Sequence, residues 1–265
     1  MVLSSKHGLV LVAFAALAAC SSVPTDDAHL AASPWAVASS GPGYAGPPWH
    51  HYRFPGKQAT QFAYSREDGR HAVLAQAVSS ASMLRQTLRI APADLGRVQF
   101  SWKVPQLITE ADLTRRQGDD SPARLILVFE GDRARFSARD TMMSELLRAL
   151  TGEELPYATL MYVWSNQPGT GSVIVSPRTD RIRKLVVESG PDRLGRWVDH
   201  ERDVRADFER AFGEAPGALV GIGIMTDTDN TRSAARAWYG PVRFLPNDAA
   251  ALPPARATAL EHFEP

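Results

Sequence analysis

The clearest pattern of apolar and polar positions along the chain lies in residues 218–244. In its first half Val220, Ile222 and Ile224 alternate with Gly221 and Gly223, which places one apolar and one nearly bare face on an extended segment. A polar turn follows, and alternation resumes over residues 235–240. The pattern predicts two β-strands that form a hairpin-like pair at the centre of an all-β domain.

Short segments of the same kind recur along the chain between turns rich in Gly, Ser, Pro and Asp. In one of them Val98, Phe100, Trp102 and Val104 share a face. The expected strands, besides the central pair, are residues 62–64, 71–78, 83–88, 98–104, 124–130, 160–164, 172–175, 181–187 and 196–199. This spacing predicts a jelly-roll-like β-sandwich of antiparallel strands over residues 59–246.

Two segments carry the period of a helix instead. The first spans Thr141 to Leu150 and is followed by Gly152; the second spans Val204 to Phe212, after the capping residue Asp203. Their apolar faces consist of Met143, Leu146, Leu147 and Leu150, and of Val204, Phe208, Ala211 and Phe212. Because neither helix alternates regularly with strands, a parallel α/β sheet is not expected.

The N-terminus has the features of an export signal. Lys6 and His7 precede the apolar run GLVLVAFAALAA, which is shorter than the ~20 residues that a membrane-spanning helix needs. Leu17-Ala18-Ala19-Cys20 resembles the bacterial lipobox, so residues 1–19 are expected to be a lipoprotein signal peptide and Cys20 the lipidated residue. Ser21 follows, which implies an outer-membrane lipoprotein that faces the periplasm. The alternative is an ordinary signal peptide with a chance cysteine.

The segments that flank the expected domain lack periodicity. Residues 20–58 are rich in Ser, Pro, Ala and Gly and predict a flexible tether, although Trp35 and Trp49 interrupt it. The tail, residues 247–265, is rich in Pro and Ala and is expected to be loosely held. The only cysteine of the chain is Cys20, so no disulfide is expected.

Composition and motifs exclude several classes of function. The 29 basic residues balance the 29 acidic ones, which argues against a nucleic-acid-binding protein. The sequence has no G-x-S-x-G, H-E-x-x-H, P-loop or dinucleotide motif. The seven histidines are scattered, and a histidine metal site is not expected.

Two acidic turns are the main candidates for a functional site. Asp227, Asp229 and Asn230 crowd their oxygens into one turn, which could hold Ca²⁺ or could bond its own backbone. Asp119 and Asp120 form a second turn, for which a solvated loop is the alternative. If both turns meet at one rim of the sandwich, their carboxylates could bind a cation or a sugar, or act as an acid/base pair in glycoside cleavage.

Aromatic and amide side chains near the strand ends suggest sugar contacts. Trp164 could stack on a sugar ring, while Asn166 and Arg124 hydrogen-bond its hydroxyls, and Trp238 is a further candidate. A tryptophan in a strand is also a common core residue, and that alternative stays open for Trp164.

Several motifs together resemble the bacterial secreted proteins known as domain of unknown function 3047. They are GDDSPARLILVF (118–129), YVWSN (162–166), RDVRADFERAFGEAP (202–216) and GIGIMTDTDNT with AWYGPVRF (221–244). The resemblance covers about residues 60–245 and departs from the family at FSARDTMMSELLRALTGEELPYA. It implies an exported single domain with a layout similar to carbohydrate-binding jelly rolls, and it assigns no activity.

These observations favour a lipid-anchored envelope protein that binds a glycan or polysaccharide without catalysis. One alternative is an enzyme that acts on polysaccharides through two of Asp119, Asp120, Asp227 and Asp229. Another is a scaffold or interaction protein of the envelope. No cofactor is expected with the exception of Ca²⁺, and the pattern leaves the oligomeric state open.

Overall fold

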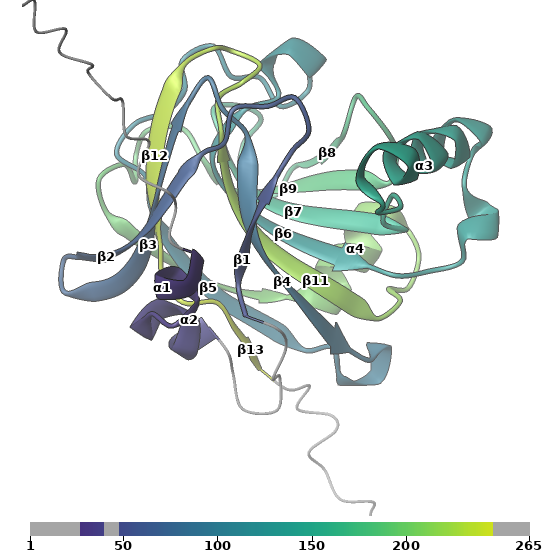
Figure 1. Ribbon diagram of the computed structural model, residues 1–265, viewed down its shortest axis with the longest axis horizontal. Helices are drawn as coiled ribbons and strands as arrows, with labels where there is room; N and C mark the ends of the chain where they lie inside the picture. The colour runs from purple at the N-terminus through teal and green to yellow at the C-terminus, as the bar shows by residue number, and fades with distance from the viewer. Residues whose placement is uncertain (1–26, 40–47, 246–265) are drawn as a thin grey trace, which may run out of the picture.

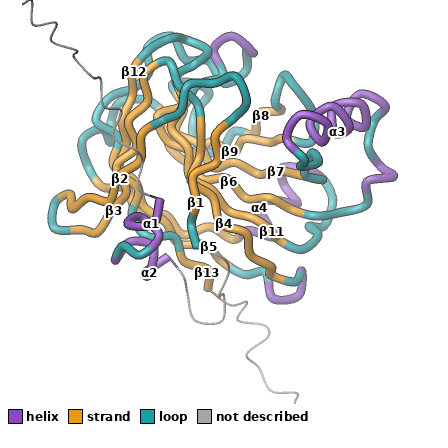
Figure 2. Tube along the Cα trace, viewed as in Figure 1, coloured by secondary structure: helices purple, strands orange, loops and turns teal. Residues whose placement is uncertain are grey.

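Two packed β-sheets form the protein in the computed structural model, which describes residues 27–39 and 48–245 (Figure 1). The seven-stranded sheet has the order β1 (His50–Arg53), β4 (Ser82–Ile90), β11 (Leu219–Asp227), β6 (Ser121–Phe129), β7 (Ala158–Ser165), β9 (Ile182–Ser189) and β8 (Val173–Val175). The second sheet has the order β10 (Trp197–Asp203), β5 (Arg97–Lys103), β12 (Ala234–Tyr239), β3 (Arg70–Val78) and β2 (Gln61–Glu67), with β13 (Arg243–Leu245) paired to β5. The predicted all-β sandwich is confirmed, and Figure 2 shows that strands and loops make up most of the structure.

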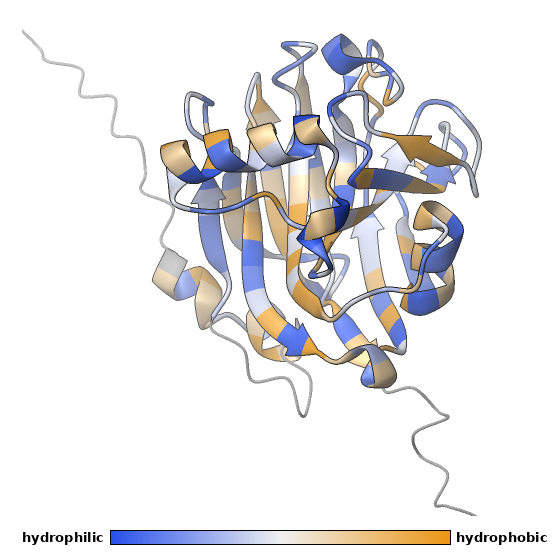
Figure 3. Ribbon diagram, turned by 90° about the vertical axis from the view of Figure 1, so that its right-hand side faces the viewer, coloured by the Kyte–Doolittle hydropathy of each residue, from blue (hydrophilic) through white to orange (hydrophobic). Residues whose placement is uncertain are grey.

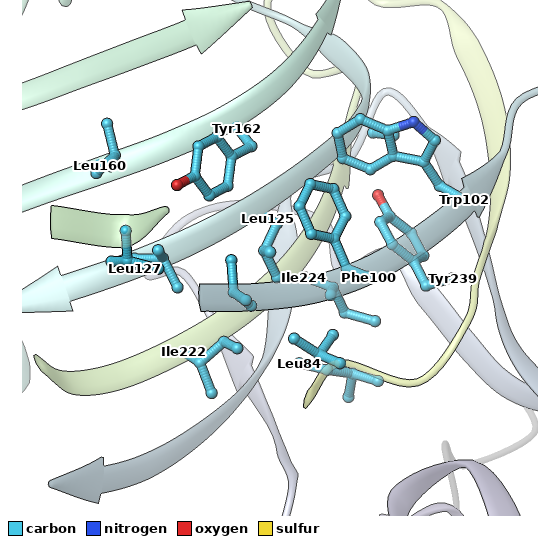
Figure 4. Close-up of a cluster of buried hydrophobic side chains, with 14 of the residues drawn as sticks. Leu84, Phe100, Trp102, Leu125, Leu127, Leu160, Tyr162, Ile222, Ile224 and Tyr239 are labelled. Atoms are coloured by element: carbon cyan, nitrogen blue, oxygen red, sulfur yellow. The ribbon is translucent and has the colours of Figure 1, made fainter. Parts of the chain in front are cut away.

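The alternation along β6 explains how the layers form. Leu125, Leu127 and Phe129 are fully buried in the main core, between the two sheets. The intervening residues, Ile126 among them, point to the opposite face of the seven-stranded sheet, because successive side chains of a strand alternate. Figure 4 shows the core side, where β4, β5, β6, β7, β11 and β12 contribute Leu84, Phe100, Trp102, Leu125, Leu127, Leu160, Tyr162, Ile222, Ile224 and Tyr239.

Two expectations about strand pairing are wrong. β11 and β12 do not form a hairpin: β11 pairs with β4 and β6, whereas β12 pairs with β3 and β5. The acidic turn between them therefore crosses from one sheet to the other. The sandwich is also not wholly antiparallel, because β7 and β9 run parallel. Period-two alternation indicates a strand and its buried face, and it does not identify the neighbouring strand.

The two predicted helices are present, but only one buries its apolar face. α4 (Val204–Phe212) begins at Asp203, whose carboxylate accepts from Ala206 N, and its Phe208 lies against Phe129 with ring centroids 4.6 Å apart. α3 (Ala138–Thr151) does not bury the apolar face that its sequence pattern shows. Its buried residues are Asp140 and Ser144.

The apolar side chains of α3 face solvent or the open side of the seven-stranded sheet. Met142, Leu146 and Leu150 are 67%, 59% and 67% exposed. Figure 1 shows α3 and α4 on opposite sides of this sheet, and Figure 3 shows apolar segments along α3. Further short helical segments are α1 (Asp27–Ala31), α2 (Pro34–Ser39), η1 (Pro92–Asp94), η2 (Arg116–Gly118) and η3 (Arg133–Arg135).

The flexible tether expected over residues 20–58 is wrong for the described part of that range. Trp35 of α2 and Trp49 are buried, with ring centroids 4.9 Å apart, and Ser39 Oγ accepts from Val242 N. The two tryptophans thus anchor this segment to the sandwich.

The expected signal peptide, the lipidation site Cys20 and the tail of residues 247–265 lie outside the described residues. Across residues 27–39 and 48–245, none of the helices has both the length and the apolar character needed to cross a bilayer.

The different packing of α3 and α4 predicts different costs for truncating their side chains. Phe208→Ala should lower the free energy of unfolding by about 3–5 kcal/mol, because it opens a cavity beside Phe129. Leu146→Ala removes an exposed side chain and should change that free energy by no more than about 0.5 kcal/mol. Urea unfolding measures both values. A loss of several kcal/mol in Leu146→Ala would contradict the observed position of α3.

Candidate functional site

A groove runs over the outer face of the seven-stranded sheet and encloses a cavity of about 660 Å³. Its floor comes from the positions that alternate with core residues on β4, β6, β7 and β11. The apolar floor consists of Met83, Ile126, Val128, Met161 and Met225. Leu147 and Leu150 of α3 line another side, and Tyr52 and Phe54 line the wall next to β1. This volume lies within the range of ligand sites, about 300–1,000 Å³.

Two glycines of β11 lower the middle of the floor. A Cβ at Gly221 would lie 3.4 Å from Val128 Cβ, an ordinary contact. A Cβ at Gly223 would come within 3.1 Å of Leu84 O and 3.3 Å of Met83 Sδ, which is tight. The bare face that the sequence shows on this strand therefore faces the groove.

A buried ion cluster forms one end of the groove. Arg124 of β6 is 3% exposed, and its Nε donates to Asp227 Oδ1 at 2.8 Å. Its Nη2 donates to Asp227 Oδ2 at 3.0 Å and to Asp119 Oδ1 at 3.2 Å. Lys184 of β9 donates to the same Asp119 oxygen at 2.6 Å and to Leu113 O at 2.9 Å. Arg124 thus brings the two predicted acidic turns together.

Burial and charge change the pKa values in this cluster. Burial raises the pKa of Asp227 to about 6, against the opposing charge of Arg124. Burial, together with the charge of Arg124, lowers the pKa of Lys184 to about 8. Burial alone would raise the pKa of Asp119, but Arg124 and Lys184 outweigh it and lower that pKa. Asp227 is therefore the carboxylate of this pair that protonates first as the pH falls.

The turn residues are engaged by protein donors. Asp120 accepts from Thr231 N at 2.7 Å and from Asn230 Nδ2 at 2.8 Å, while Asp229 pairs with Lys57. One oxygen each of Asp120, Asp227 and Asp229 lies within 4.8 Å of the others, a spacing that could suit a cation. A Ca²⁺ ion there would compete with Arg124 and Lys57. The contacts thus fit the alternative that these side chains hold the turn.

Four of the six predicted ligand-binding residues do not face the groove. Trp164 is fully buried, and its Nε1 donates to Gly190 O at 3.1 Å, so it cannot stack on a sugar. Asn166 Nδ2 donates to the carbonyls of Ile108 and Ala111 at 2.7 and 3.1 Å. Trp238 lies on the other sheet, its ring centroid 5.6 Å from Lys103 Nζ. Arg124 and Asp119 do border the groove, whereas Asp120 lies behind it in the turn.

Sequence reasoning missed the residues that give the groove its character. These are the three methionines of the floor and the cations Lys57, Arg85, Arg178 and Lys184. A signal was available: on β6, β7 and β11 the groove residues occupy the positions that alternate with the core. Among the missed cations, Arg85 of β4 forms a two-pronged ion pair with Glu153, which follows α3, and its Nη1 lies 2.7 Å from Oε2.

Comparisons with known proteins identify the family of this chain, and distant similarities to solved structures. A family model described as "Protein of unknown function (DUF3047)" matches residues 47–243. No curated protein matches the sequence. The xyloglucanase domain of NopAA, a type three effector from Sinorhizobium fredii solved in complex with cellobiose, is 9% identical. The similarity covers 76% of this chain and 94% of that one, with a TM-score of 0.37, which is too distant to inform on ligand or reaction.

The ion cluster predicts a structural cost for the loss of one carboxylate. Asp227→Asn should lower the free energy of unfolding by about 3–5 kcal/mol, because it leaves the buried Arg124 undercompensated. The matched control is Asp199→Asn, which breaks an exposed pair with Arg70 and should cost less than about 1 kcal/mol. Urea unfolding at neutral pH compares the two. Equal stability of Asp227→Asn and the parent protein would show that Asp227 does not hold the fold.

Proposed function

This chain belongs to the DUF3047 family of proteins of unknown function, and we propose that it is a non-catalytic binding protein whose ligand lies in the groove of the seven-stranded sheet. The groove itself is the main support. Its apolar floor is separate from the main core and is covered by neither the second sheet nor α4. Ile126 and Met225 are buried and the other floor residues are half-buried, so the floor lies at the bottom of a concave, mostly apolar cavity. Cavities of this kind are typical ligand sites in proteins.

The ion cluster favours binding over catalysis. A general acid or base must be free to exchange a proton with the substrate, and Asp227 and Asp119 already share one guanidinium. Glu153, the carboxylate nearest α3 on the groove wall, is held by Arg85 in the same way. One observation favours the enzyme alternative, namely the pKa of Asp227, which burial raises to about 6. On that alternative, Asp227→Asn would abolish glycoside hydrolysis without loss of stability.

Glycan or polysaccharide remains one candidate ligand, and the outer membrane remains the proposed location. A sugar would have Tyr52 and Phe54, with ring centroids 5.5 Å apart, as its aromatic contacts. The lipobox-like sequence at Cys20 supports an envelope lipoprotein attached to the membrane by its acylated N-terminus. The exposed stripe of α3 supports a scaffold role only if a protein partner covers it.

Filling the groove tests the binding function directly. Gly221→Leu adds a side chain over the floor, where the first added carbon makes only an ordinary contact with Val128. Gly169→Leu is the matched control, because a Cβ there meets nothing within 4 Å. Each protein is assayed for retention on polysaccharide affinity gels and for binding of long-chain fatty acids.

The proposal predicts that one of these two ligand classes binds the parent protein and Gly169→Leu but binds Gly221→Leu at least ~10-fold more weakly. Circular dichroism confirms that each variant is folded. Binding that survives in Gly221→Leu, or a parent protein that binds neither class, would contradict a ligand site in this groove.

A further inference from the structure

The lining of the groove points to the class of its ligand. Five apolar side chains from four strands form the floor, and three of them are methionines, Met83, Met161 and Met225. Methionine is flexible and polarizable, so such a surface adapts to apolar ligands of variable shape. The five floor side chains carry no strong hydrogen-bonding group, and polar lining residues such as Arg85 and Arg124 are already paired with carboxylates. The floor therefore favours an apolar body over the hydroxyls of a sugar.

α3 supplies an apolar surface on another side of the groove. It is attached through polar contacts: Asp140 accepts from Thr179 Oγ1, and Ser144 Oγ accepts from Leu155 N at 3.1 Å. Leu147 and Leu150 line the cavity, and neither is buried by the protein itself. An apolar chain in the groove would remove from water the exposed parts of these leucines and of the half-buried Met83 and Met161.

One cation of the groove lacks an acidic partner. Lys57, Arg85, Arg124 and Lys184 each pair with a carboxylate. Arg178, from the loop between β8 and β9, contacts no carboxylate of the described residues. Its side chain makes one hydrogen bond, from Nη2 to Asn230 Oδ1 at 3.0 Å, and is only half-buried. Its Nε is buried without a hydrogen-bond partner in the described part of the chain, so the polar end of the groove presents a guanidinium whose remaining Nη hydrogens can pair with an anion.

We propose that the groove binds a long-chain fatty acid, with the alkyl chain along the methionine floor beneath α3 and the carboxylate at Arg178. The proposal rests on the groove being a ligand site. Charge complementarity selects the head group, since a guanidinium matches a carboxylate in two-pronged geometry. The apolar lining selects the alkyl chain, because the floor and α3 offer apolar contact along the cavity. A polysaccharide is the competing occupant.

Displacement of the fluorescent fatty acid cis-parinaric acid measures binding to the parent protein, Arg178→Gln, Gly221→Leu and the control Arg70→Gln. The competitors are saturated fatty acids of increasing length and the methyl ester of hexadecanoic acid. Affinity should rise about threefold to fourfold with each added methylene until the groove is full. Arg178→Gln should weaken the binding of hexadecanoic acid about 10-fold or more, and should change the binding of its methyl ester less than threefold. For the ester, Arg178→Gln and the control Arg70→Gln should have the same affinity.

The outcomes separate this inference from the proposed function. Equal affinity for acid and ester, or an unchanged acid affinity in Arg178→Gln, would overturn the head-group assignment. The parent protein could instead bind a polysaccharide gel and no fatty acid, with Gly221→Leu abolishing that retention. This result would overturn the fatty acid as the ligand and would leave the groove as the binding site. Binding of neither class would overturn both.

Discussion

The structure depends on a seven-stranded sheet whose two faces are both apolar. Alternation along β6 and β11 places Leu127 and Ile224 in the core and Ile126 and Met225 on the opposite face. The second sheet and α4 cover the first face, and their burial drives folding. The opposite face receives only α3, which does not bury its leucines. The groove follows from that unequal covering, so fold and candidate function share one cause.

The buried ion cluster fixes one end of this groove. Arg124 sits in a buried, mostly apolar strand, where an isolated guanidinium would be strongly unfavourable. The two carboxylates of Asp119 and Asp227 balance the positive charges of Arg124 and Lys184. These contacts hold the turns that carry the two aspartates against β6. The same contacts occupy the carboxylates that a hydrolase would need. The cluster is thus better suited to shape a pocket than to move protons.

The sequence was sufficient for most strands and for the two longer helices, but not for β1, α1 and α2 in the expected tether, nor for the arrangement of the strands. Alternation identified the buried face of β5 and the span of α4, because each depends on local periodicity. It could not show that β11 and β12 belong to different sheets, since a hairpin and a crossover have the same local pattern. Trp164 follows Leu160 and Tyr162 at alternate positions, so the pattern already favours its place in the core, which is the alternative that the structure shows. The sequence around Arg178 gives no sign of a ligand contact. Its proposed role depends on the other groove cations having carboxylate partners while Arg178 has none among the described residues, and only the structure shows this.

Methionine methyl NMR tests most directly whether the floor of the sheet is a ligand surface. With ¹³C-methyl methionine, the account predicts that hexadecanoic acid shifts the signals of Met83, Met161 and Met225, which line the groove. Met142, on the outer side of α3, should move far less. Shifts confined to Met142, or no shifts in the three floor methionines at saturating ligand, would contradict a fatty-acid site in this groove.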